Sequence, residues 1–150
     1  MPAPDIVNNN EIINSTQATT STGSKTKWET YTNTDEPHFT IQYPSTWERR
    51  GELAGMNFSG PEGWIEITFG DGFGGGYCTD PDNLGLKIED YSIKSQGLSG
   101  CKTTKPNGTI QTMLFRQFRP GVSIKIESGA NSSTDAVKLE NILATFEFTK

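Results

Sequence analysis

The sequence lacks several features that common functional classes require. Its longest uninterrupted apolar runs, at 113–115 and 142–144, are three residues long, whereas a membrane-spanning helix needs about 20. No Lys/Arg run exceeds the pair Arg49-Arg50, and the formal net charge is −5. The chain therefore has neither a membrane helix nor the basic surface that binds a nucleic-acid backbone.

Aromatic residues are missing from the first 27 positions. The eight Phe, four Tyr and three Trp all lie at or after Trp28. Residues 1–27 are instead rich in Asn, Gln, Ser, Thr and Gly, and such a composition cannot bury enough apolar surface to order itself. We expect a disordered Ser/Thr/Asn-rich linker at 1–27 and one folded domain at 28–150. The linker suits a stalk that holds the domain away from a surface, and a frayed terminus is the alternative.

Alternation of apolar and polar residues dominates the folded region. Segments 39–43, 65–69 and 122–126 alternate strictly, which predicts half-buried antiparallel strands with one face on a core. Weaker strand candidates are 28–33, 56–58, 91–95 and 110–118. The tripeptide Arg119-Pro120-Gly121 predicts a turn that folds the last of these back onto the next strand.

One stretch follows a helical period. Residues 132–135 form a capping segment, and the apolar side chains that follow recur on one stripe: Ala136, Leu139, Leu143 and Phe146. This pattern predicts a helix over about 134–144 that leads into a short strand at 146–148. Strands followed by a C-terminal helix, without strict alternation of the two, predict an α+β domain with an antiparallel sheet covered by helix.

Aromatic motifs near both ends of the folded region resemble those of a known family. They read Phe39-Thr-Ile-Gln-Tyr-Pro-Ser-Thr-Trp47-Glu and Ile142-Leu-Ala-Thr-Phe-Glu-Phe148. They look like the opening F-x-I-x-Y-P-x-x-W strand and the closing I-x-x-S/T-F-x-F of the PsbP-like domain family, over roughly Trp28 to Lys150. The resemblance implies an antiparallel β-sheet flanked by helices, an αβα sandwich, in a bacterial secreted or lipoprotein-type protein. It transfers no catalytic motif.

A glycine-rich segment at 70–76 formally satisfies G-x-G-x-x-G after a predicted strand. No helix follows it, and Asp71 inside it would repel a pyrophosphate, which argues against a nucleotide site. Phe73 and Tyr77 sit where no periodic pattern buries them, and aromatic side chains on an adaptable loop are frequent anchors of recognition. We therefore expect Asp71, Phe73 and Tyr77 to bind a partner. Packing of both rings onto the sheet is the alternative.

The segment that follows, Asp80-Pro81-Asp82-Asn83-Leu84-Gly85, resembles the opening of a calcium loop. It lacks a ligand at position five and the bidentate glutamate at position twelve, so it is not an EF-hand. An irregular calcium site made by Asp71, Asp80 and Asp82 stays open as an alternative to a turn held by its own side-chain hydrogen bonds.

The only two cysteines are Cys78 and Cys101. Their spacing fits neither a CxxC redox motif nor a four-ligand zinc site, so they predict one disulfide, with two separate thiols as the alternative. A disulfide indicates an oxidising, extracytoplasmic compartment.

These observations contain no catalytic constellation. They predict a non-catalytic, extracytoplasmic interaction module that is tethered to the cell envelope and binds no cofactor. We expect it to recognise a protein or cell-surface partner through residues 70–83. The alternative is a domain that binds a small ligand or calcium through the same Gly/Asp-rich loop.

Overall fold

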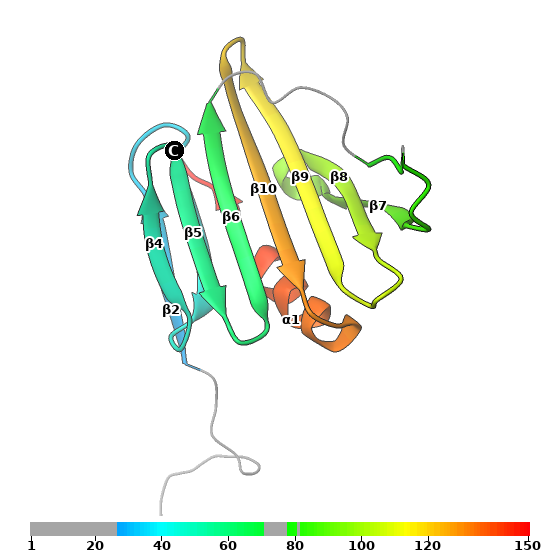
Figure 1. The fold of residues 1–150 in the computed structure, drawn as a ribbon. Helices are drawn as coiled ribbons and strands as arrows, with labels where there is room; N and C mark the ends of the chain where they lie inside the picture. Colours follow the sequence, from blue (N-terminus) through cyan, green and yellow to red (C-terminus); the bar gives the residue numbers. More distant parts are fainter. Residues whose placement is uncertain (1–26, 71–77, 81) are drawn as a thin grey trace, which may run out of the picture.

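The structure, a computed structural model, describes residues 27–70, 78–80 and 82–150. Seven antiparallel strands form the larger of two sheets: β4 (Glu48–Glu52), β5 (Gly55–Gly60), β6 (Gly63–Gly70), β7 (Lys87–Ile93), β8 (Leu98–Thr104), β9 (Ile110–Arg119) and β10 (Val122–Ala130). Their spatial order is β4-β5-β6-β10-β9-β8-β7 (Figure 1). The smaller sheet has the order β11-β3-β2 and consists of β2 (Trp28–Asn33), β3 (Phe39–Pro44) and β11 (Glu147–Phe148). The helices are the short 3-10 helix η1 (Lys94–Gln96) and α1 (Ser133–Leu143).

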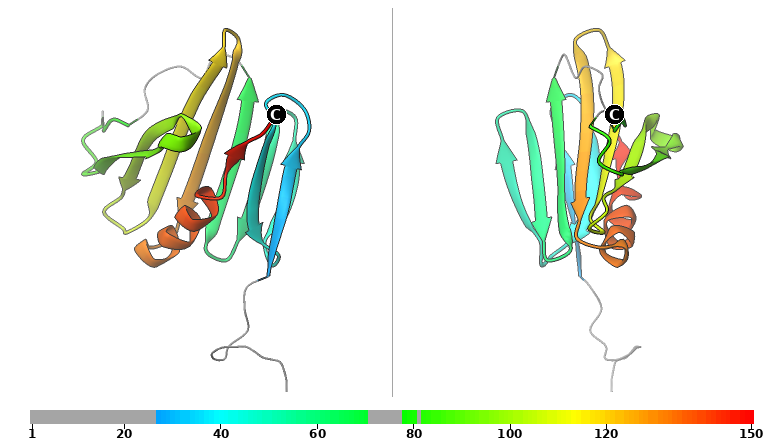
Figure 2. Two further views of the ribbon diagram at one scale, coloured as in Figure 1. Left: turned by 180° about the vertical axis from the view of Figure 1, so that it is seen from behind. Right: turned by 45° about the vertical axis from the view of Figure 1, so that its right-hand side comes forward.

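The smaller sheet and α1 lie on the same side of the larger sheet. Figure 2 shows α1, β11 and β2 in front of the seven strands when the molecule is seen from behind. We call this side of the larger sheet the covered face and the other side the open face. The described residues place no second layer on the open face.

The expectation of a sheet flanked by helices is therefore wrong. The domain is a β-rich α+β fold in which one C-terminal α-helix covers one face. The second element on the covered face is a sheet of β2, β3 and β11 beside α1, and the described residues place no helix on the other face. This packing buries the alternating aromatic residues of the smaller sheet, because sheets stack face to face through such side chains.

The core lies between the covered face and these two elements. Alternate side chains of the central strands are fully buried there, as the period of two requires: Ile65, Ile67, Leu114, Ile124 and Ile126 are at most 1% exposed. Aromatic pairs join the layers. Phe39 stacks on Phe146 with ring centroids 5.0 Å apart, and Tyr43 lies 5.0 Å from Phe58.

Several expected elements are confirmed. Strands β9 and β10 form the hairpin across the Arg119-Pro120-Gly121 turn, and α1 begins where the capping segment places it, since the Ser132 hydroxyl accepts the Asp135 N–H at 3.1 Å. The motif that ends the opening strand also behaves as expected. Strand β3 stops at Pro44, and Trp47 folds back to become 5% exposed. Strands β4 and β8 were not expected from the sequence.

The predicted disulfide is present between Cys78 and Cys101, with a Cα–Cα distance of 5.7 Å. It ties the segment before β7 to β8, which is the neighbour of that edge strand among the described residues. The predicted linker falls on residues 1–26, which lie outside the described part of the chain, and on Lys27, whose carbonyl accepts the Ser45 N–H at 2.7 Å.

Candidate functional site

The partner-binding residues expected from the sequence, Asp71, Phe73 and Tyr77, lie outside the described residues. The ends of their segment are described. Gly70 closes β6, and Cys78 is bonded to Cys101 on β8. Because β10 and β9 separate β6 from β8 in the sheet, the disulfide attaches Cys78 to a strand that is not a neighbour of β6. The prediction about the three side chains stays a prediction.

The carboxylate of Asp80 holds the turn that leads into β7. Its two oxygens accept the backbone N–H groups of Leu84 at 2.8 Å, of Gly85 at 3.1 Å and of Leu86 at 3.1 Å. These hydrogen bonds, led by the one from Leu84, lower the pKa of Asp80 below its ordinary value. Asp82 is exposed, and no three His, Cys, Asp or Glu side chains of the described residues are arranged to hold a metal ion. The Asp80 oxygens are therefore already used within the turn.

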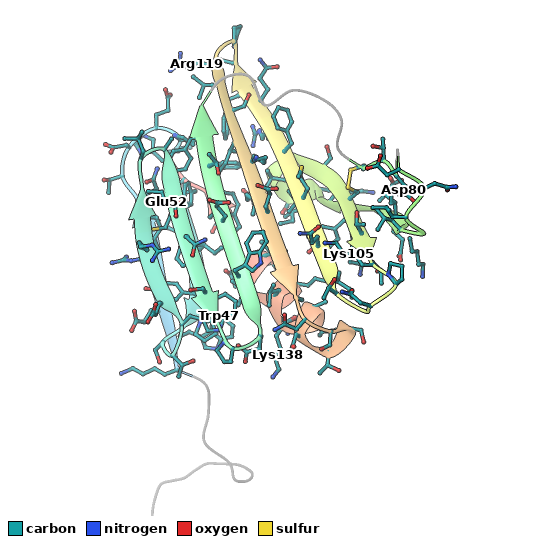
Figure 3. All side chains as sticks on the ribbon, in the orientation of Figure 1. Trp47, Glu52, Asp80, Lys105, Arg119 and Lys138 are labelled. Atoms are coloured by element: carbon teal, nitrogen blue, oxygen red, sulfur yellow. A yellow bond between two sulfur atoms is a disulfide. The ribbon has the colours of Figure 1, made fainter. Side chains whose placement is uncertain are left out.

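The open face carries the side chains that alternate with the buried core. On β6 these are Trp64, Glu66 and Thr68, which flank the buried Ile65 and Ile67. The register of the sheet places side chains of the neighbouring strands beside them: Glu52 of β4, Asn57 of β5, Lys125 and Glu127 of β10, and Met113 and Phe115 of β9. Figure 3 labels Glu52 at one edge of the sheet and Asp80 beyond the other edge, so the Asp80 turn is separate from the Glu52 side.

A cluster of carboxyl groups on this face reaches from the edge strand β4 to the central strand β10. Glu66 is the Cα register partner of Glu127 and shares a side-chain hydrogen bond with Glu52. A hydrogen bond between two carboxyl groups needs a proton, since two carboxylates have no donor. Partial burial, and then the charges of Glu52 and Glu127, raise the pKa of Glu66, while Lys125 opposes this rise. The cluster therefore holds more negative charge than its own cations neutralise.

Two cations of the described residues lie on the open face near this cluster. Arg50 is two residues from Glu52 on β4 and is the register partner of Asn57, which in turn lies opposite Glu66. Lys125 of β10 adjoins Glu127, and its ammonium is engaged there. It lies 3.2 Å from a Glu127 oxygen, and both side chains are less than one-third exposed. Lys125 and Glu127 are two residues apart on β10, so both point to the same face. Three glutamates of the cluster, Glu52, Glu66 and Glu127, therefore face two cations, Arg50 and Lys125.

A shallow pocket lies beside the carboxyl cluster, next to the disulfide. It has a volume of about 230 Å³ and is lined by Trp64, Cys78, Thr79, Leu86, Cys101, Thr103, Gln111, Thr112, Met113, Glu127 and Ser128. The Trp64 indole lies flat against β10, because a Cβ atom at Gly129 would come within 2.5 Å of its Nε1. Glu127 borders both the pocket and the carboxyl cluster, so apolar and acidic surface adjoin on the open face.

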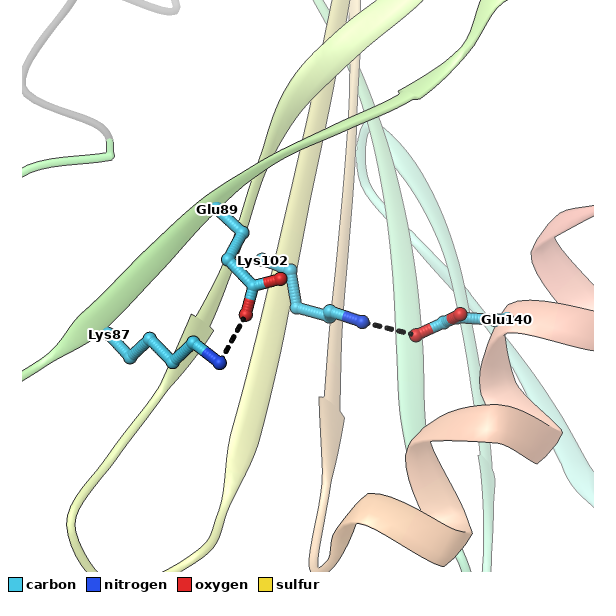
Figure 4. Close-up of polar contacts among 4 residues, drawn as sticks. All are labelled: Lys87, Glu89, Lys102 and Glu140. Carbon is cyan, nitrogen blue, oxygen red and sulfur yellow. Dashed lines mark hydrogen bonds and ion pairs between the residues drawn. The ribbon is translucent and has the colours of Figure 1, made fainter.

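Charged groups near α1 on the covered face serve a different purpose. The Lys102 ammonium reaches from β8 to the Glu140 carboxylate of α1 at 3.1 Å, and Lys87 pairs with Glu89 along β7 at 3.2 Å (Figure 4). Burial, with a smaller contribution from the Glu140 charge, raises the pKa of Tyr91 to about 12. The Lys102–Glu140 pair fastens the helix to the sheet, so we place the candidate site on the open face.

The sequence did not identify Glu52, Trp64, Glu66 or Glu127 as site residues. Each occupies the polar position of an alternating strand, where a side chain in water is the ordinary outcome. Their strands are far apart in the chain, and only the register brings them together.

No family model and no curated protein sequence matches the chain. Among solved structures it is similar to cyanobacterial PsbP (CyanoP) from Synechocystis sp. PCC 6803, with a TM-score of 0.49, 11% identity, and coverage of 87% of this chain and 98% of that one. It is also similar to a chain from Bacteroides thetaiotaomicron VPI-5482, with a TM-score of 0.44 and 16% identity over 75% of this chain. It spans 45% of that Bacteroides chain.

Proposed function

We propose that the protein is a non-catalytic, extracytoplasmic interaction module whose open face binds a protein partner that presents basic side chains. The observation that carries this proposal is the Glu52–Glu66–Glu127 cluster on a sheet face that the described residues leave uncovered. Burial first, and then the charges of Glu52 and Glu127, raise the pKa of Glu66, and a Lys or Arg placed there by a partner would neutralise the repulsion among the three carboxyl groups.

Apolar surface beside the cluster supports a protein rather than a lone cation as the ligand. Trp64 and Met113 line the pocket that Glu127 shares with the cluster. Interfaces between proteins combine aromatic and methionine side chains at the centre with charges that set orientation and association rate. The disulfide also holds Cys78 at this pocket, so one residue of the segment expected to recognise a partner lies beside this apolar surface.

The cellular location is part of the proposal. The Cys78–Cys101 disulfide supports an oxidising compartment. No helix in the described part of the chain has the length and apolar character needed to cross a membrane. The alternative, a calcium or small-ligand domain built on the aspartates, has less support because a ligand at Asp80 would compete with the three backbone N–H groups that its oxygens accept.

The test selects binding peptides from a displayed random library on the immobilised protein and measures their affinities in solution. We expect the selected peptides to be enriched in Lys and Arg. The double variant Glu66→Gln/Glu127→Gln should bind them about tenfold more weakly, which corresponds to about 1.4 kcal/mol. Raising the salt concentration should weaken binding to the parent protein more than binding to this variant.

Glu147→Gln, compared with each single variant Glu66→Gln and Glu127→Gln, is the matched control, because it removes one negative charge from an exposed side chain of β11, on the covered side. It should leave the affinities unchanged. Gln for Glu keeps the shape of the side chain and relieves repulsion in the cluster, so the double variant should stay folded. Peptides without a basic excess, or peptides that bind the double variant as tightly as the parent protein, would overturn the proposal.

A further inference from the structure

A second pocket lies at the end of the domain where β2 begins, away from the carboxyl cluster. Its volume is about 280 Å³, and its lining comes from β2, from the β3–β4 and β5–β6 connections, and from α1: Trp28, Pro44, Thr46, Trp47, Glu62, Lys138, Asn141 and Ile142. Figure 3 labels Trp47 and Lys138 close together at this end of the molecule. The volume is near the lower limit of the range found for small-ligand sites.

The polar side of this pocket is held in place. The Trp47 Nε1–H donates to one Glu62 oxygen at 2.9 Å, and the Lys138 ammonium lies 3.7 Å from the other. The Trp47 ring itself is fixed by close packing on Gly60, where an added Cβ would lie 2.2 Å from Nε1. Each carboxylate oxygen has more than one lone pair, so Glu62 keeps acceptor capacity toward the pocket.

The other side of the pocket is aromatic and open to solvent. Trp28 is 44% exposed, whereas Trp47 is 5% exposed. Four large hydrophobic side chains are strongly exposed in the described residues, and Trp28 is the only aromatic one among them. An indole normally buries most of its large apolar area, so an exposed ring at the rim of a pocket offers a flat surface on which a ligand can stack.

We propose that this pocket binds a carbohydrate, as a single pyranose unit or the terminal unit of a glycan. A pyranose has one ring face of C–H groups, which fits the Trp28 indole, and an edge of hydroxyl groups. Those hydroxyls can donate to Glu62 and accept from Lys138, while the Asn141 amide both donates and accepts.

The charges of the pocket favour a neutral ligand over an ionic one. Glu62 repels an anion and Lys138 repels a cation, and the two groups together carry no net charge. Each sugar hydroxyl is both a donor and an acceptor, so hydroxyl groups can donate to the Glu62 carboxylate and accept from the Lys138 ammonium.

The test titrates the full-length, ¹⁵N-labelled protein with neutral sugars, namely methyl glycosides of glucose, galactose, mannose and N-acetylglucosamine and their β1,4-linked disaccharides. Sorbitol serves as a control, because it has similar hydroxyl groups but no ring face. We expect at least one sugar to shift the indole N–H signals of Trp28 and Trp47 saturably, in the millimolar range, and sorbitol to shift neither.

Variants assign the binding to the pocket. Trp28→Ala should weaken binding about tenfold, as expected for the loss of an aromatic stacking partner, and Trp28→Phe should restore part of it. Leu53→Ala is the matched control, because it also removes a large exposed apolar side chain, and it should bind as the parent protein does. Glu66→Gln/Glu127→Gln should also bind the sugar normally, so the two proposals fail independently.

Three results would overturn this inference: no saturable shift with any sugar of the panel, equal shifts with sorbitol, or binding that survives Trp28→Ala unchanged. A variant that begins at Ser24 adds a fourth. If sugars bind only after residues 1–23 are removed, the occupant of the pocket in the full chain is the chain itself, and the pocket is not a carbohydrate site of this protein.

Discussion

The disulfide offers the most direct test of how this domain is held together. Cys78 and Cys101 are 23 residues apart in sequence, and the loop between them contains β7, η1 and the start of β8. Strand β7 is an edge strand that pairs only with β8. Replacing both cysteines by alanine leaves the pairing intact but removes the covalent tie that precedes it.

The expected cost follows from the entropy of the unfolded chain. The disulfide closes a loop of 23 residues. In the chain-entropy model, removing it gives the unfolded chain more conformational freedom and lowers the free energy of unfolding by about 3.4 kcal/mol at 25 °C. In a protein of this size, such a loss lowers the melting temperature by roughly 10 °C. Cys101 is 4% exposed, so the alanine variant adds a small packing loss that reduction of the parent protein does not.

The assay is thermal and urea denaturation of the oxidised parent, the reduced parent and the Cys78→Ala/Cys101→Ala variant, followed by amide hydrogen exchange. Both perturbed forms should melt at a lower temperature, and the amides of β7 should lose more protection than those of β10 in the centre of the sheet. A change in melting temperature below about 2 °C in both forms would refute the reasoning. So would alkylation of both thiols in denatured protein that had never been reduced.

Further predictions concern stability. Gly100→Ala should cost about 2 kcal/mol or more, because its Cβ would lie 1.8 Å from the Met113 carbonyl oxygen, whereas Gly51→Ala, with its nearest contact at 3.8 Å, should be nearly neutral in the same urea titration. Ser132→Ala should cost about 1 kcal/mol through loss of the α1 N-cap, and an unchanged urea midpoint would contradict this. Because the pKa of Glu66 is raised, its carboxyl group binds a proton more tightly in the folded protein than in the unfolded chain. The stability that this bound proton contributes at low pH is lost as the pH rises above 4.5. The free energy of unfolding of Glu66→Gln, relative to that of the parent protein, should therefore increase from acid to neutral pH. If the two proteins show parallel pH dependences, the raised pKa does not belong to Glu66.

Strands with strict alternation could be predicted from the sequence, whereas others could not. Segments 39–43, 65–69 and 122–126 bury most of one row of side chains, with only Phe69 and Val122 of these rows partly exposed, so the period of two is visible in their residue types. Strand β4 (Glu48–Glu52) is exposed along its whole length at the edge of the sheet, and β8 is interrupted by Gly100. Neither strand has a row of alternating apolar residues that would reveal it in the sequence. Each is a strand because its backbone pairs with that of a neighbouring strand.

The candidate site was less predictable than the fold. Glu52, Glu66 and Glu127 are ordinary polar residues of three separate segments, and nothing local marks them as neighbours. Their interaction depends on the order β4-β5-β6-β10 and on a register that sets Glu66 opposite Glu127. A shift of one residue would turn either side chain to the covered face.

The sequence by itself determined the local features of this protein: the period-two strands, the capped amphipathic helix α1, the turn at Pro120, and the return of Trp47 after Pro44. Each depends on residues close together in the chain, whose backbone preferences and side-chain periods act without distant partners. Only the tertiary structure decided that β2, β3 and β11 form a second sheet, and that this sheet and α1 cover the same face. That choice depends on which apolar surfaces bury one another, since the hydrophobic effect is non-directional and many arrangements satisfy the same local pattern. It left one face of seven strands open and brought the glutamates together there.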